Sequence, residues 1–126
     1  MIAVDTSSMI AFFQGEEGND IEIIRDCIEA GNIMLPPLVL TELLSDFGFP
    51  REIYEVLTAL PLLEIKDGYW ERAGNLRAMI LAKKLKARVV DTLIAQICLD
   101  HDLALITRDS AFKKFAKFTN LRIVNH

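Results

Sequence analysis

The sequence predicts an α/β domain built on a buried parallel sheet. Two observations carry this prediction: short apolar runs of strand type recur along the chain, and segments with helical periodicity separate them. Such alternation is typical of a parallel sheet covered by helices. The chain has 126 residues, 52% of them apolar and 25% charged, with no linker or repeat. That length suits one ordinary domain, so we expect residues 1–126 to form a single domain.

The expected strands are apolar runs of three to five residues that end at turn or capping residues. Because they are short and continuously apolar, they indicate a sheet that is buried on both faces. In chain order they are residues 2–4, 33–35, 62–65, 103–106 and 121–124.

The expected helices are placed by their start and stop signals. Asp5-Thr6-Ser7-Ser8 is a helix-start signature, Gly31 is a stop, and Pro37 suits the first turn of a helix. Asp67 is expected to cap a long helix, and Asp91 to open a strongly apolar one. The helices are expected through residues 9–13, from Asn19 or Asp20 to Gly31, from Pro37 to about Asp46, from Pro50 to about Leu60, from Asp67 to Leu81, and over 92–99 and 110–117.

Three aspartates share one setting: Asp5 and Asp109 each follow a strand and precede a helix, and Asp91 heads a helix. Each of them alone is explained as a helix cap. In a parallel sheet, however, all strand-to-helix junctions lie at the carboxyl edge, where such folds bind ligands. Glu42, about one and a half turns into its helix, reaches the same edge. Because four crowded carboxylates repel one another, we expect a hard divalent cation to neutralise them.

Other residues narrow the chemistry. Asp100 and Asp102 precede a strand and are interpreted as turn residues at the opposite edge, and the acids between positions 16 and 29 as a solvated helix face. The chain has no glycine-rich phosphate loop and no G-x-S-x-G motif. His101 lies at the opposite edge and His126 is the last residue, so a nuclease that relies on paired histidines is poorly supported.

Charge is unevenly distributed along the chain. Residues 1–63 carry 2 basic and 11 acidic side chains, whereas residues 64–126 carry 12 basic and 7 acidic ones. If the basic side chains of residues 64–126 share one face, they would attract a phosphate backbone. The alternative is that they form an ordinary solvated surface. No apolar run approaches the ~20 residues that span a bilayer, and we expect no export signal, because the first residues lack a basic region and a small-residue cleavage site. Cys27 and Cys98 lack metal or redox spacing, so we expect reduced thiols, a cytoplasmic location and no membrane partner.

Four segments, MIAVDTSSMI, LTELLSD, VVDTLIAQIC and LALITRDSAF, resemble in order and spacing the acidic motifs of PIN-domain nucleases. The resemblance extends from Asp5 to Asp109, and a chain of this size looks most like the VapC-type toxins of toxin–antitoxin pairs. It implies a Rossmann-like three-layer sandwich with a central, mostly parallel sheet of 4–5 short strands. It also implies a ribonuclease that depends on Mg²⁺ or Mn²⁺ and leaves a 3′-hydroxyl and a 5′-phosphate.

The resemblance implies roles for individual residues. It assigns metal binding and catalysis to Asp5, Glu42, Asp91 and Asp109, and the holding of a metal-bound water to Thr107. Pro37 departs from the family, which more often has Ser or Thr before the glutamate helix. The basic residues expected to position the RNA are Lys84, Lys86, Arg88 and Arg108.

Toxin-like members of this family are held inactive by a small antitoxin and often form homodimers, so RNA, an antitoxin and a second copy are the expected partners. Segment 53–63 is either part of an interface or core. A receiver-type phosphoacceptor would need an acid pair at the first strand, and a D-x-D phosphatase a second acid where Ser7 stands. The remaining alternative is a non-catalytic or housekeeping RNA-processing PIN module that acts through partner binding. A non-catalytic module would be expected to lack one or more of the acids, whereas a housekeeping RNA-processing role stays open.

Overall fold

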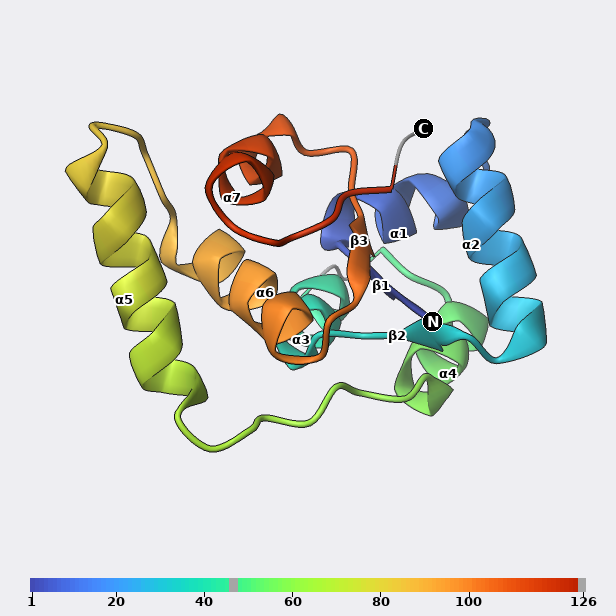
Figure 1. Ribbon diagram of the computed structural model, residues 1–126. Coiled ribbons are helices and arrows are strands. Elements are labelled where there is room, and N and C mark those ends of the chain that lie inside the picture. The colour runs from blue at the N-terminus through green and yellow to red at the C-terminus, as the bar shows by residue number, and fades with distance from the viewer. Residues whose placement is uncertain (46–47, 125–126) are drawn as a thin grey trace.

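A computed structural model describes residues 1–45 and 48–124, and within them the sheet has three strands in the order β2-β1-β3 (Figure 1). β1 spans Ile2–Val4, β2 spans Ile33–Met34 and β3 spans Ala104–Ile106. β1 is central and runs parallel to both neighbours. All carboxyl ends of the sheet therefore face the same edge, as the α/β pattern predicts.

The prediction of 4–5 strands was too high for the part of the chain that the structure describes. The segments expected as strands at 62–65 and 121–124 each form a single parallel bridge instead. At each bridge one residue of the neighbouring segment, Leu35 or Leu105, makes a pair of 2.9 Å backbone hydrogen bonds. Among the described residues, these two segments make no further strand pairing with the sheet. Apolar composition alone does not reveal how far an edge segment pairs.

Helices cover the sheet on both faces, with α2 on one side of the strands and α5 and α6 on the other (Figure 1). The three-layer α/β arrangement is therefore confirmed. The helices are α1 (Thr6–Phe13), α2 (Asn19–Ala30), α3 (Pro37–Leu44), α4 (Arg51–Ala59), α5 (Tyr69–Ala82), α6 (Val89–Asp100), the 3-10 helix η1 (Ser110–Phe112) and α7 (Lys113–Phe118). The helix end expected near Asp46 lies outside the described residues. None of the described helices is long and apolar enough to cross a membrane.

Two helices begin elsewhere than the capping signals indicated. α5 starts after Gly68, whose φ of 80° is left-handed, and Asp67 is therefore not its cap. α6 starts at Val89, because the carbonyl of Arg88 accepts hydrogen bonds from both the amide and the hydroxyl of Thr92. The first turn of α6 is thus closed ahead of the expected start, and Asp91 lies inside that turn rather than at the cap.

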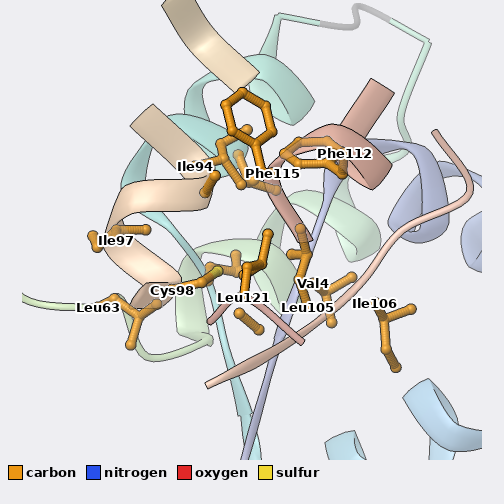
Figure 2. Packing of buried hydrophobic residues seen from close by; sticks show 14 of the residues in the cluster. Val4, Leu63, Ile94, Ile97, Cys98, Leu105, Ile106, Phe112, Phe115 and Leu121 are labelled. Carbon is orange, nitrogen blue, oxygen red and sulfur yellow. The ribbon is translucent and has the colours of Figure 1, made fainter. Parts of the chain in front are cut away.

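The hydrophobic core links the sheet to α6 and α7. Figure 2 shows Phe112 and Phe115 close to Ile94 of α6, and all three side chains are buried. The two rings lie 6.1 Å apart between centroids. Because η1 and α7 are anchored in this way, the residue at the start of η1, Asp109, is held near the N-terminal end of α6.

The two cysteines are free. Cys98 is fully buried in α6, and this burial raises the pKa of its thiol to about 12. Cys27 is half-buried on α2. A thiol whose pKa is raised in this way stays protonated and packs as a small apolar side chain.

Candidate metal centre

A surface pocket of about 220 Å³ lies at the carboxyl edge of the sheet and gathers the four acids that the sequence singled out. They come from four separate segments: the ends of β1 and β3 and the helices α3 and α6. Arg88 and Ser7 also line the pocket. The topological argument thus places these side chains together, while their chemical roles stay predictions. The four acids are Asp5, Glu42, Asp91 and Asp109.

Asp5 is one of the two most enclosed of these acids, with 4% of its surface exposed, the same fraction as Asp91. Its Oδ2 accepts a 2.8 Å hydrogen bond from the hydroxyl of Thr107 and a 3.0 Å bond from that of Ser7. Burial raises the pKa of Asp5 above its usual value, the two hydroxyls oppose the rise, and the negative charge of Glu42 adds to it. Asp5 makes no side-chain cap bond to α1, so capping does not explain its position.

Ser7 is part of the site although it was not among the candidate residues. Its Oγ lies 3.3 Å from Oγ1 of Thr107 and accepts a 3.0 Å hydrogen bond from the backbone amide of Arg108. Thr107 in turn accepts a 3.0 Å bond from the amide of Asp109. The two hydroxyls therefore bind the ends of β1 and β3 together. The signal in the sequence was the position of Ser7, two residues beyond Asp5 at the same strand end.

The guanidinium of Arg88 lies between the carboxylates of Asp91 and Asp109. Arg88 donates from Nε and Nη2 to the two carboxylate oxygens of Asp91, at 3.0 and 3.1 Å. Its Nη2 also lies 3.6 Å from Oδ2 of Asp109. The other oxygen of Asp109 accepts a 2.9 Å bond from the amide of Ala111 and caps η1. Of the three aspartates interpreted as possible caps, Asp109 alone has a capping bond among the described residues.

Glu42 approaches the pocket from α3. Its Oε1 accepts a 2.8 Å hydrogen bond from the hydroxyl of Thr6, the first residue of α1. The helix is seated by the fully buried Val39 and Leu43, which place Glu42 on its exposed side. Pro37, which departs from the family pattern, lies at the start of α3, and all four acids still line the pocket.

A divalent cation fits this site in donor type and in charge. Hard cations take oxygen ligands, and the pocket offers carboxylates with hydroxyls behind them. As the side chains stand, no three of the described Asp, Glu, His or Cys residues form a ready set of metal ligands. Arg88 explains this in large part, because its guanidinium forms ion pairs with Asp91 and Asp109, two of the four acids. The fit therefore requires Arg88 to release these two carboxylates.

The other predicted basic residues do not line the pocket. The guanidinium of Arg108 turns to the start of α2, where Nε lies 2.6 Å from Oδ2 of Asp20 and Nη1 lies 3.4 Å from Glu16. The interpretation of Asp20 as part of a solvated face was therefore wrong, since its side chain is 1% exposed. Lys84 and Lys86 are exposed on the segment between α5 and α6.

The acids at the other end of the strands have different partners. Asp100 accepts hydrogen bonds from Nε and Nη2 of Arg72, at 2.9 and 2.6 Å. Although burial opposes the change, these bonds and one from Gln96 hold the pKa of Asp100 below its usual value. Asp102 has the left-handed φ of 51° found in turns, and His101 bonds the carbonyl of Glu64. None of these residues lines the pocket of the four acids.

The chain belongs to the PIN domain family, whose model matches residues 2–118. Among curated proteins it is similar to VapC ribonuclease Mb1587 of Mycobacterium bovis and to Ribonuclease VapC11 of Mycobacterium tuberculosis. Each is 27% identical over 129 residues, which cover 97% of this chain and 96% of the relative. The family resemblance drawn from the four motifs is therefore confirmed.

Solved structures share the fold over the whole chain. VapBC2 from Rickettsia felis, bound to a DNA fragment from its promoter, has a TM-score of 0.77 at 20% identity and covers 100% of this chain and 99% of its own. FitAcB from Neisseria gonorrhoeae has a TM-score of 0.73 at 16% identity, with 99% and 97% covered. These likenesses establish the PIN fold for this chain.

Proposed function

We propose that the chain is an endoribonuclease that hydrolyses RNA phosphodiester bonds with the help of Mg²⁺ or Mn²⁺. The observation that supports this most is the placement of Asp5, Glu42, Asp91 and Asp109 around one pocket at the carboxyl edge of the sheet. The ribonucleases to which the chain is similar align with 97% of its length. The alternative of a non-catalytic module has no comparable support, because it would be expected to lack one or more of these acids.

In this proposal the four carboxylates hold the ion, and Thr107 and Ser7 hold Asp5 in place. The bound ion supplies Lewis-acid chemistry, which activates water and stabilises negative charge on the phosphate. The hydroxyl of Thr107 fixes one oxygen of Asp5 and the amide of Asp109 at the same time. Once its guanidinium releases Asp91 and Asp109, Arg88 would remain beside the pocket and would bind a phosphate of the substrate.

The test is cleavage of a labelled single-stranded RNA by the purified protein in Mg²⁺, in Mn²⁺ and in EDTA. We expect cleavage with either ion, none in EDTA, and products that carry a 3′-hydroxyl and a 5′-phosphate. Asp5→Asn should cut RNA more slowly by about two or more orders of magnitude, because it removes a charged ligand without changing the size of the side chain. Undiminished cleavage in EDTA, or by Asp5→Asn, would contradict the proposal.

We further propose that residues 1–126 act as one domain in the cytoplasm, as the toxin of a type II toxin–antitoxin pair. The structures to which the chain is similar include VapBC and FitAB toxin–antitoxin complexes, which supports a small antitoxin as the partner and leaves room for a second copy of the chain. Expression in a host cell should arrest growth, and co-expression of a short reading frame next to the gene should relieve the arrest. Growth that the wild-type chain and Asp5→Asn affect equally would speak against the toxin role.

A further inference from the structure

Two segments that start at the acidic pocket carry lysines and no acids. One runs back from Arg88 to the end of α5, and the other runs forward from Asp109 through η1 and α7. Residues 72–90 and 110–124 contain no Asp or Glu. We call the six lysines of these two segments the lysine surface: Lys83, Lys84, Lys86, Lys113, Lys114 and Lys117.

The two segments lie beside each other at both of their ends. At the pocket, Nη2 of Arg88 is 3.6 Å from Oδ2 of Asp109. At the far end, Nζ of Lys83 lies 4.4 Å from the centroid of the Phe118 ring, and Nζ of Lys117 lies 5.2 Å from the same centroid. Figure 1 shows the yellow-to-orange loop after α5 passing beside the red α7. The lysine surface therefore extends from the pocket along both segments.

The charge of this surface is not balanced within the described part of the chain. Every ion pair there uses an arginine, and no lysine has a carboxylate partner. Lys83 and Lys117 share one aromatic ring, which is worth about 0.5–1 kcal/mol to an exposed ammonium group. The ring also brings two like charges near each other, where they repel. An external anion beside the two ammonium groups would reduce this repulsion.

We propose that the lysine surface binds the backbone of single-stranded RNA on one side of the bond that is cut. The inference rests on the proposed function, because it takes the acidic pocket as the place of cleavage. Ammonium groups that follow two segments away from a pocket match the successive phosphates of a strand that leaves it. Lysines beside a partly exposed aromatic ring are a combination that proteins use for single strands. Lys84 and Lys86 belong to this surface, whereas the guanidinium of Arg108 is held by Asp20.

The experiment measures binding separately from cleavage. The probe is a fluorescein-labelled oligouridine of about 15 nucleotides, followed by fluorescence anisotropy in EDTA at several salt concentrations. The test variant is Lys83→Gln with Lys117→Gln. The control is Lys66→Gln, the same type of substitution, which removes one ammonium charge from a lysine that donates to the carbonyl of Asp100, away from the lysine surface. All three lysines are exposed, so both variants are expected to fold.

We expect the double variant to raise the Kd about 20-fold at 0.1 M salt, and to lower the slope of log K against log salt by about 1.4, because each lost phosphate contact on a single strand contributes about 0.7. The Lys66→Gln control should stay within about twofold of the wild type. In Mg²⁺, the double variant should raise KM and leave kcat at saturating RNA unchanged.

Three outcomes would overturn the inference. The first is an unchanged Kd and slope in the double variant, and the second is an equal loss of binding in Lys66→Gln. The third is displacement of the RNA by polyglutamate of the same total charge as readily as by unlabelled oligouridine, which would assign the surface to an acidic protein. Binding that behaves as expected, together with no cleavage in any metal, would refute the proposed function alone.

Discussion

Thr107 donates a 2.8 Å hydrogen bond to Oδ2 of Asp5 and so joins the carboxyl ends of β3 and β1 at the floor of the acidic pocket. The same hydroxyl accepts a bond from the amide of Asp109. Of the three partners that this hydroxyl has among the described residues, Asp5 and Asp109 are therefore residues to which we assign metal binding, and the third is Ser7.

Thr107→Val should weaken metal binding more than it destabilises the fold. The variant keeps the shape of the side chain and leaves the buried carboxylate of Asp5 with one hydroxyl donor fewer, which costs about 1–3 kcal/mol of unfolding free energy. Loss of such a supporting bond typically reduces metal affinity about 10- to 100-fold. Titration calorimetry with Mn²⁺ and denaturant unfolding measure the two effects. Thr107→Ser keeps the hydroxyl and should restore the affinity, and a serine variant as weak as the valine variant would contradict this role.

Arg88→Gln should bind Mg²⁺ or Mn²⁺ more tightly than the wild type, by roughly tenfold or about 1.4 kcal/mol. The guanidinium holds both oxygens of Asp91 and approaches Asp109, so a metal ion must displace it. The same substitution should weaken RNA binding, since it removes a phosphate partner. Calorimetry with the metal alone and anisotropy with RNA in EDTA report the opposite effects. A metal affinity that falls would show that Arg88 supports the ion instead of competing with it.

Asp91→Asn should separate a ligand from a structural residue. Asp91 lies inside the first turn of α6, and its ion pair with the largely exposed Arg88 contributes only about 0–1 kcal/mol. Relief of repulsion from the other carboxylates offsets this loss, so stability in EDTA should change little. Mg²⁺ should then raise the melting temperature less than in the wild type, and RNA cleavage should fall by orders of magnitude. Asp102→Asn, at an exposed turn, serves as the control, and full cleavage by Asp91→Asn would leave Asp91 with a structural role only.

Arg108→Met should destabilise the fold by about 2–3 kcal/mol, because the buried Asp20 loses the guanidinium that pairs with it. The expectation that Arg108 binds RNA makes a different prediction, a higher Kd with little change in stability. Urea unfolding and RNA anisotropy on the same variant decide between the two. A stable variant that binds RNA weakly would restore the RNA-binding role.

Asp100 should make stability depend on pH in the acid range. The pKa of its carboxyl is lower in the folded protein than in the unfolded chain, so its pairing with Arg72 stabilises the fold above the unfolded value near 4. This stabilisation is lost as the pH falls through the lower pKa of the folded state. Asp100→Asn should therefore be less stable than the wild type by about 1 kcal/mol at pH 7, and the two unfolding curves should converge in strong acid. A difference that stays constant with pH would exclude the ion pair as its cause.

The order of the elements and the grouping of the acids could be predicted from the sequence, because both follow from local pattern and topology. Short apolar runs and helix boundaries such as Gly31 specify the α/β alternation. A parallel sheet then forces Asp5 and Asp109 to one edge, whatever the details of packing. The four motifs pointed to the PIN family for the same reason, since their spacing reflects this topology.

Tertiary structure decided which groups pair across the fold. Asp20 looked like any other acid on a solvated helix, and became buried because Arg108, which is distant in sequence, reaches it. Ser7 entered the site through Thr107, and the lysines of two separate segments met at Phe118. The two segments expected as edge strands form only single bridges, because the extent of strand pairing depends on which segments lie beside them in the fold. Local composition sets where each chain segment turns and which face it buries, whereas a salt bridge or a shared ring depends on distances that exist only once the segments have packed.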